Sequence, residues 1–110
     1  MSAAHLVEVN DRNFAKEVLS SEQPVLVKFW ASWCGSCRSV TPVVEGVAAQ
    51  YSDRIRVGKV DVDENGRMAA EYHVYAVPTL IIFRKGKVVD RVVGSLPRAK
   101  LEAFLARALR

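Results

Sequence analysis

The chain has only two cysteines among its 110 residues, too few for the disulfide framework of a small secreted domain. No apolar run approaches the roughly 18 residues of a membrane-spanning helix, which argues against that class. The first five residues, Met-Ser-Ala-Ala-His, lack the basic and apolar regions of a signal peptide. Repeats and low-complexity segments are also absent. We therefore expect a single domain over residues 1–110, in the cytoplasm and away from membranes, where thiols are normally reduced.

Three common catalytic motifs are missing: G-x-S-x-G, H-E-x-x-H and the phosphate-binding loop. Acidic residues are scarce near the end of the chain. Residues 84–110 carry eight Lys or Arg against Asp90 and Glu102, within a net charge of +4. Nucleic-acid binding would need these bases on one face with exposed aromatic residues between them. A solvated basic surface is the favoured interpretation, with no nucleic-acid partner.

The apolar periodicity predicts nine elements in the order βαβαβαββα. Strands are expected at 5–9, 25–31, 55–63, 79–83 and 88–93. Helices are expected from Asn10 to Ser20, along the apolar stripe from Val40 to Tyr51, at about 65–72, and from Pro97 onward. Alternating units imply parallel strands, and the last two strands form a hairpin that turns at Gly86. The predicted class is α/β, with a mixed five-stranded sheet, an antiparallel closing hairpin and four helices.

What the chain does have is a close thiol pair, Cys34 and Cys37, directly after an apolar strand. In the first turn of a helix, positions three apart share a face, with Cβ atoms roughly 5–6 Å apart. A disulfide needs Cα atoms within roughly 4.4–6.8 Å, so this pair can form one without backbone movement. Free amides and the helix dipole favour the thiolate of Cys34, which makes it the attacking thiol. Cys37, one turn inside the helix, is the resolving thiol.

Zinc binding is the competing use of a C-x-x-C pair. Structural zinc takes four ligands, and only His5, His73 and distant acids could join the two cysteines. Neither histidine lies at ligand spacing from the other, so we predict no metal site. An inert surface thiol pair is a further alternative.

The chain resembles the thioredoxin family over nearly its whole length. The matching motifs are Phe29-Trp30-Ala31-x-Trp33-Cys34-Gly35-x-Cys37, Pro42, Asp61-Val62-Asp63, Val77-Pro78-Thr79, Lys85-Gly86 and Val93-Gly94. The resemblance implies the thioredoxin fold, a sheet flanked by helices, with a cis peptide at Val77–Pro78 pressed against the cysteines. It also implies a substrate-binding rim made of Trp33, Gly35, Ser36, Val77, Pro78, Val93, Gly94 and Ala76.

The resemblance implies a protein disulfide reductase that works by dithiol–disulfide exchange. Cys34 attacks a substrate disulfide, and Cys37 resolves the mixed disulfide, which leaves the Cys34–Cys37 disulfide. No cofactor is bound, and a thioredoxin-reductase-like flavoprotein that uses NADPH would restore the dithiol. The other partners are disulfide-containing proteins, and a monomer is expected. Two alternatives stay open: a non-catalytic binding or assembly module with a structural or sensory disulfide, and a more oxidising oxidase or isomerase.

The sequence departs from the family pattern at three places. Ser36 replaces a proline between the cysteines, and Tyr75 with Ala76 replaces a more typical Arg/Lys-Gly pair. The most consequential departure is Lys28, because typical thioredoxins carry a buried aspartate there.

Lys28 should point beneath the active-site helix, since it shares a strand face with residues 26 and 30. The family partner of the aspartate is a lysine, matched by Lys59, so two lysines would meet. Two buried ammonium groups are costly. Either one is neutral or an acid compensates, and Asp61 is the candidate acid. Lys28 would then tune Cys37 by its charge or as a base, unless it extends its ammonium to water.

Overall fold

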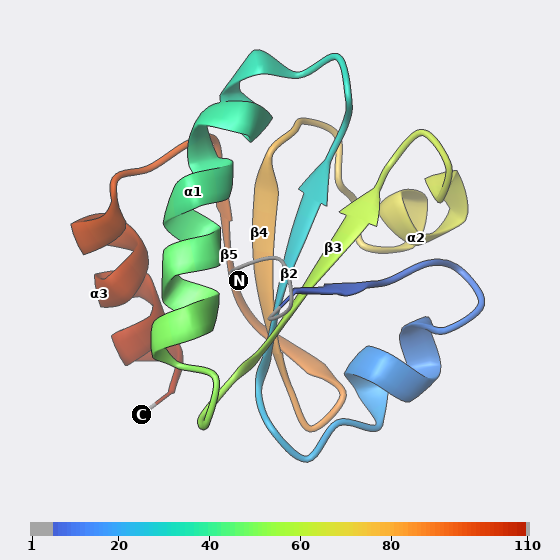
Figure 1. Cartoon of the computed structure of the whole chain (residues 1–110). Coiled ribbons are helices and arrows are strands. Elements are labelled where there is room, and N and C mark those ends of the chain that lie inside the picture. The colour runs from blue at the N-terminus through green and yellow to red at the C-terminus, as the bar shows by residue number, and fades with distance from the viewer. Residues whose placement is uncertain (1–5, 110) are drawn as a thin grey trace.

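The computed structural model describes residues 6–109. Over this range the chain forms five strands and four helical segments in the predicted order (Figure 1). The strands are β1 (Leu6–Glu8), β2 (Val25–Trp30), β3 (Arg56–Asp61), β4 (Thr79–Arg84) and β5 (Lys87–Val93). The helical segments are η2 (Ala15–Leu19), α1 (Gly35–Gln50), α2 (Gly66–Glu71) and α3 (Arg98–Ala108). The strand expected at 5–9 corresponds to β1, and His5 lies outside the described residues.

The five strands form one sheet in the order β1–β3–β2–β4–β5. Strands β1, β3 and β2 are parallel, whereas β4 runs antiparallel to β2 and β5 antiparallel to β4. The β4–β5 hairpin turns at Lys85 and Gly86, whose φ angles are 52° and 79°. Glycine adopts this left-handed region without steric cost. The predicted mixed sheet with an antiparallel closing hairpin is confirmed.

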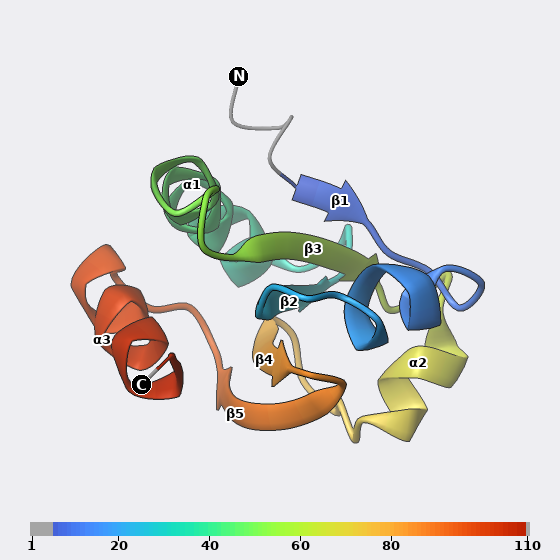
Figure 2. The ribbon, with the colours of Figure 1, turned by 90° about the horizontal axis from the view of Figure 1, so that it is seen from below.

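Helices cover both faces of the sheet. Helices α1 and α3 lie on one face, and η2 and α2 lie on the other (Figure 2). Side chains alternate across a strand, so β2 sends Leu26 toward α1 and α3 and sends Val27 and Phe29 toward η2 and α2. The same alternation places Lys28 on the α1 face, as predicted. Lys28 and Lys59 are Cα partners on β2 and β3.

The first helical segment is shorter than predicted and of another type. Asn10 Oδ1 accepts hydrogen bonds from the amides of Arg12 and Asn13, so the residue caps a turn. The regular segment is a five-residue π-helix, Ala15–Leu19, inside the expected range 10–20. Two buried side chains, Phe14 and Val18, pack it against the sheet. Its register is therefore set by the core rather than by its cap.

Helix α1 begins one residue after Cys34 and continues through Pro42 to Gln50. Three of its buried residues, Val40, Val44 and Val47, pack on the sheet and fix the position of its first turn. That turn lies at the carboxyl end of β2, where the cysteines are. Among the helices described between residues 6 and 109, none has the length and apolarity needed to cross a membrane.

Candidate active site

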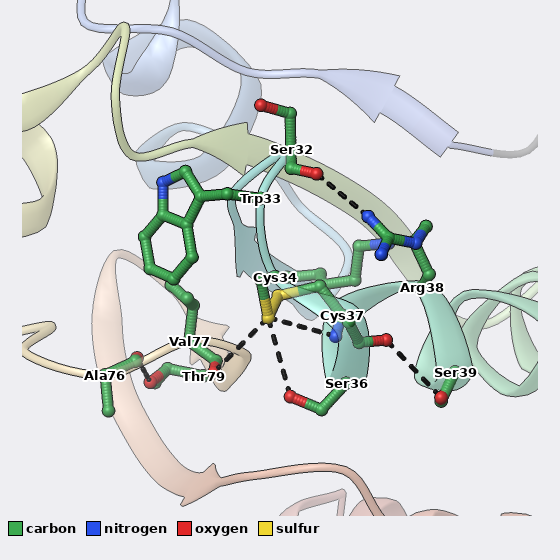
Figure 3. The surroundings of a disulfide bond; sticks show 12 residues. Ser32, Trp33, Cys34, Ser36, Cys37, Arg38, Ser39, Ala76, Val77 and Thr79 are labelled. Atoms are coloured by element: carbon green, nitrogen blue, oxygen red, sulfur yellow. Dashed lines mark hydrogen bonds between the residues drawn. A yellow bond between two sulfur atoms is a disulfide. The ribbon is translucent and has the colours of Figure 1, made fainter.

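The two cysteines form a disulfide at the N-terminus of α1 (Figure 3). Their Cα atoms are 5.3 Å apart, within the range expected from the C-x-x-C spacing. Cys34 is the N-cap residue, with extended backbone angles, and its Sγ accepts the Cys37 amide hydrogen at 3.1 Å. A thiolate at this position would keep that donor and gain from the helix dipole. Cys34 is 5% exposed and Cys37 is 2% exposed, so Cys37 is the more covered sulfur.

Two further polar atoms lie near the Cys34 sulfur. The Ser36 hydroxyl oxygen is 3.5 Å from Sγ, and the Val77 carbonyl oxygen is 3.6 Å from it (Figure 3). The hydroxyl can donate to a thiolate, which adds to the stabilisation by the Cys37 amide. The side chain of Ser36 therefore contributes directly to the environment of Cys34, besides its backbone N–H.

The loop that faces the disulfide contains the cis peptide Val77–Pro78, as the resemblance implied. The Gly94 amide donates to the Pro78 carbonyl at 2.8 Å, and the Thr79 hydroxyl donates to the Ala76 carbonyl at 2.6 Å. These bonds tie the loop to the start of β4 and to the end of β5. The backbone of Val77 is thereby held beside Cys34.

Three large apolar side chains from the segments that carry the predicted rim are exposed. Trp33 is 67% exposed, Val93 is 59% exposed and Tyr75 is 85% exposed. Trp33 is positioned by a hydrogen bond from its Nε1 to Asp63 Oδ2 at 2.9 Å. The predicted rim residues come from three places in the chain: the loop before α1 with the first turn of that helix, the loop before β4 and the end of β5.

Lys28 is buried beneath α1 and does not extend its ammonium to the surface, since the residue is only 4% exposed. Its Nζ donates to Thr41 Oγ1 at 2.9 Å, and the Thr41 hydroxyl donates to the Cys37 carbonyl at 2.9 Å. A chain of two hydrogen bonds therefore joins the lysine to the backbone of the inner cysteine.

Burial is the main cause that lowers the pKa of Lys28, and the charge of Lys59 lowers it further. The carboxylate that opposes this shift is Glu45, on α1. Asp61, the predicted partner, instead accepts the Asp63 amide hydrogen at its Oδ1. Glu45 is therefore the acid identified at Lys28, and a compensating role of Asp61 stays a prediction. The periodicity of a strand identifies neighbours on the sheet, but it does not identify the acid that α1 places over Lys28.

A cavity of about 280 Å³ lies next to Cys37. Lys28 lines it from β2 and Lys59 from β3, and Arg38 and Thr41 line it from the first turns of α1. The predicted tuning residues Lys28 and Lys59 therefore share this cavity with Cys37. The outer sulfur faces the Val77 loop instead.

Sequence reasoning missed three residues that the structure adds to the site: Thr41, Glu45 and Asp63. Thr41 and Glu45 lie four and eight positions after Cys37, on the helix face that carries that cysteine. The helical spacing could therefore have indicated both of them. Asp63 could not be found in this way, because it meets Trp33 only through the packing of two loops.

Between residues 6 and 109, no three His, Cys, Asp or Glu side chains gather in a way that could hold a metal ion. His73, considered above as a zinc ligand, has its Nδ1 3.0 Å from the Tyr75 hydroxyl. The zinc interpretation therefore finds no ligand set in this part of the chain.

Comparison with known proteins gives a family match over residues 5–107, to the model named Thioredoxin. "Thioredoxin 1" of Nostoc sp. is 50% identical over 109 residues, 99% of this chain and 100% of the relative. "Thioredoxin 1" of Synechococcus elongatus is 50% identical over 101 residues, 92% of this chain and 94% of the relative. A "Bifunctional thioredoxin reductase/thioredoxin" of Mycobacterium leprae is 46% identical over 100 residues, 91% of this chain but 22% of that protein.

Proposed function

We propose a division of roles among the site residues from one premise: the chain belongs to the thioredoxin family. It is accordingly a thiol–disulfide oxidoreductase that reduces protein disulfides by dithiol–disulfide exchange, with a redox-active cysteine pair and no bound cofactor. The observation that supports the roles is the position of Cys34 as N-cap of α1, where its sulfur accepts the Cys37 amide hydrogen.

In the first step the Cys34 thiolate attacks one sulfur of the substrate disulfide. A bond forms between these two sulfurs, and the other substrate sulfur leaves as a thiolate. In the second step the Cys37 thiolate attacks the Cys34 sulfur and expels the remaining substrate thiolate. The substrate gains two electrons, the protein ends with the Cys34–Cys37 disulfide, and the two thiolates take up protons from solvent.

The substrate segment binds in extended form along the loop before β4. The backbone of Val77 would pair with the substrate as a neighbouring strand does, and Pro78 would contact the substrate beside it. Trp33, Gly35, Ser36 and Gly94 form the rest of the contact surface. The exposure of Trp33 and Val93 beside a buried disulfide supports this role, because substrate would cover apolar surface there.

Lys28 acts on the second step. It lines the same cavity as Cys37 and is hydrogen-bonded to Thr41, which bonds to the Cys37 carbonyl. A neutral Lys28 would take the Cys37 proton as a base, and a charged one would stabilise the developing thiolate. Lys59 lowers the pKa of Lys28 and so favours the first route.

A thioredoxin-reductase-like flavoprotein that uses NADPH regenerates the dithiol. The Mycobacterium leprae relative, whose name combines thioredoxin reductase and thioredoxin, supports this partner. We further propose that the chain works as a single thioredoxin-like domain over 1–110, as a monomer and in the cytoplasm, where a dithiol stays reduced.

The test is reduction of insulin, followed by precipitation of its free chain, with dithiothreitol and then with a reductase plus NADPH. Cys34→Ser should abolish the activity, whereas Cys37→Ser should trap the substrate as a mixed disulfide on Cys34. Stable adducts on Cys37 in the Cys34→Ser protein would reverse the two roles. Activity with dithiothreitol but none with the reductase would reject the flavoprotein partner alone.

A further inference from the structure

The cavity beside Cys37 combines a buried amine with two other cationic side chains. Lys28, Lys59 and Arg38 all line its wall, and its volume is about 280 Å³. Among the residues that line it in the described part of the chain, none is acidic. A cavity of this composition favours a negative charge inside it.

The amine of Lys28 differs from a surface lysine in its protonation. Burial and the neighbouring Lys59 lower its pKa, against the opposing effect of Glu45. A larger share of Lys28 is therefore present as the neutral amine, which carries a free electron pair. Only this form is nucleophilic, as with other lysines whose pKa is lowered by burial.

We propose that Lys28 is a carbon dioxide acceptor, which forms a carbamate on its Nζ inside this cavity. The nitrogen electron pair forms a bond to the carbon of carbon dioxide, and one carbon–oxygen π pair moves onto oxygen. The nitrogen then releases one proton to solvent through the cavity, whose edge includes the exposed residues Ser32 and Arg38. The balanced change is R–NH₂ + CO₂ → R–NH–COO⁻ + H⁺.

The surroundings of Nζ suit this product. The carbamate adds three heavy atoms, which is small against the cavity volume of about 280 Å³. Lys59 and Arg38 supply positive charge for its carboxylate, and the Thr41 oxygen, 2.9 Å from Nζ, can keep accepting a hydrogen bond from the carbamate N–H. The modification also removes the repulsion between Lys28 and Lys59 and replaces it with an attraction.

Glu45 is the charged group that opposes the reaction. Its carboxylate favours the protonated ammonium of Lys28 and disfavours a second negative charge nearby. Lys59 should therefore promote the carbamate, whereas Glu45 should suppress it. The inference does not depend on the catalytic role proposed for Lys28, because uptake is measured without any turnover.

The experiment uses the full oxidised chain, labelled with ¹⁵N at the lysine side-chain nitrogens and equilibrated with ¹³C-bicarbonate in mildly alkaline buffer. A carbamate carbon is bonded to nitrogen, so its ¹³C signal is split by one-bond coupling to ¹⁵N. We expect one strongly populated coupled signal, absent from Lys28→Met and retained in the matched control Lys100→Met, which removes an exposed lysine of α3.

Lys59→Met should lower the occupancy roughly tenfold, since it removes the partner charge and the cause of part of the lowered pKa. Glu45→Gln should raise the occupancy several-fold. Absence of a coupled ¹³C signal would overturn the proposal, as would a coupled signal that persists in Lys28→Met; free bicarbonate and a carbamate on the unlabelled α-amine give only uncoupled signals. The Lys28→Met protein is first shown to be folded by its amide spectrum, and Glu45→Gln tests the same prediction with Lys28 retained.

Failure of this proposal and failure of the proposed function are separable. Insulin reduction in carbon dioxide-free buffer reports on Cys34 and Cys37 whatever the labelling gives. A carbamate on a chain without reductase activity would reject only the proposed function. Reductase activity without a carbamate would reject only the carbamate proposal.

Discussion

Lys28 Nζ lies 2.9 Å from Thr41 Oγ1, and the hydroxyl of Thr41 in turn donates to the carbonyl of Cys37. A buried ammonium therefore has a hydroxyl as its hydrogen-bond acceptor, and Glu45 supplies a compensating charge. A hydroxyl satisfies a donor but offsets none of the charge, so burial of Lys28 remains costly. This arrangement makes Lys28 the residue whose removal tells most about the site.

Lys28→Met should slow the resolution of the mixed disulfide on the order of tenfold or more, with little change in the first attack by Cys34. Methionine has a similar length but neither charge nor proton-accepting nitrogen. The variant should also unfold at equal or higher urea concentration, because the burial penalty is gone. Single-turnover kinetics and urea unfolding on the same protein check both statements. Unchanged resolution would mean that Lys28 takes no part in catalysis.

The stability difference between Lys28→Met and the parent protein should depend on pH. Because the pKa of Lys28 is lowered in the folded state, the unfolded chain binds more protons between that lowered pKa and the ordinary lysine value of about 10.4. The parent protein therefore gains stability relative to the variant as pH rises through this window. The advantage of Lys28→Met should be largest at neutral pH and should shrink in alkaline buffer. Urea unfolding of both proteins along a pH series measures it, and a constant difference would contradict the lowered pKa.

Ser36→Pro should make the protein more reducing. The change removes the hydroxyl that lies 3.5 Å from Cys34 Sγ and can donate to the reduced thiolate. It also removes one of the free amide hydrogens in the first turn of α1, which favour an anion there. A loss of about 1.4 kcal/mol would lower the potential by roughly 30 mV. Ser36→Ala keeps the amide and should fall between the two proteins in a glutathione-buffered titration. An unchanged or higher potential in Ser36→Pro would reject this explanation.

Trp33→Ala should weaken the binding of protein substrates more than it affects the chemistry. The indole is 67% exposed beside the disulfide, and removing such an aromatic contact typically costs about 1–2 kcal/mol of binding. We expect KM for insulin to rise roughly tenfold, whereas the rate with a small-molecule disulfide stays the same. Trp33→Phe keeps a ring but loses the hydrogen bond to Asp63, so it separates contact from orientation. Equal losses with both kinds of substrate would place Trp33 in the chemistry instead.

Gly58→Ala should destabilise the fold by about 1–3 kcal/mol, because added bulk in a packed core forces its neighbours to shift. A Cβ at position 58 would lie 2.8 Å from Val9 Cγ2 and 3.4 Å from the Val7 carbonyl. Gly66 is the matched control, since a Cβ there meets nothing within 4 Å. Gly66→Ala, at the first residue of α2, should leave the stability unchanged or raise it by up to about 1 kcal/mol, because alanine restricts the unfolded chain. Thermal unfolding of both variants checks the contrast.

The parts of the structure that were predictable from the sequence depend on local patterns. Alternating and helical periodicities predicted the order of the elements, and the spacing of Cys34 and Cys37 predicted the disulfide. Both features depend on residues that are close together in the sequence. Glu45, the acid that acts on Lys28, was missed for the opposite reason. Strand periodicity reveals same-strand neighbours such as Asp61, whereas Glu45 comes from the helix that covers the sheet. The π-helical form of η2 was not foreseen, since it follows from how its side chains fit the core.

The short span of the disulfide links redox chemistry to folding through a thermodynamic cycle. Cys34 and Cys37 are only three residues apart, so their bond restricts little of the unfolded chain, and an unfolded Cys34–Cys37 pair is close to an ordinary peptide dithiol. The difference in unfolding free energy between the reduced and oxidised forms then equals the difference in potential between the folded and unfolded pair, multiplied by the charge of two electrons. Each contact that is stronger with the reduced sulfur, such as that from the Ser36 hydroxyl, raises the stability of the reduced form and the oxidising power of the disulfide by the same free energy. Two denaturation curves, one for each redox form, therefore measure the potential of this protein relative to its own unfolded chain.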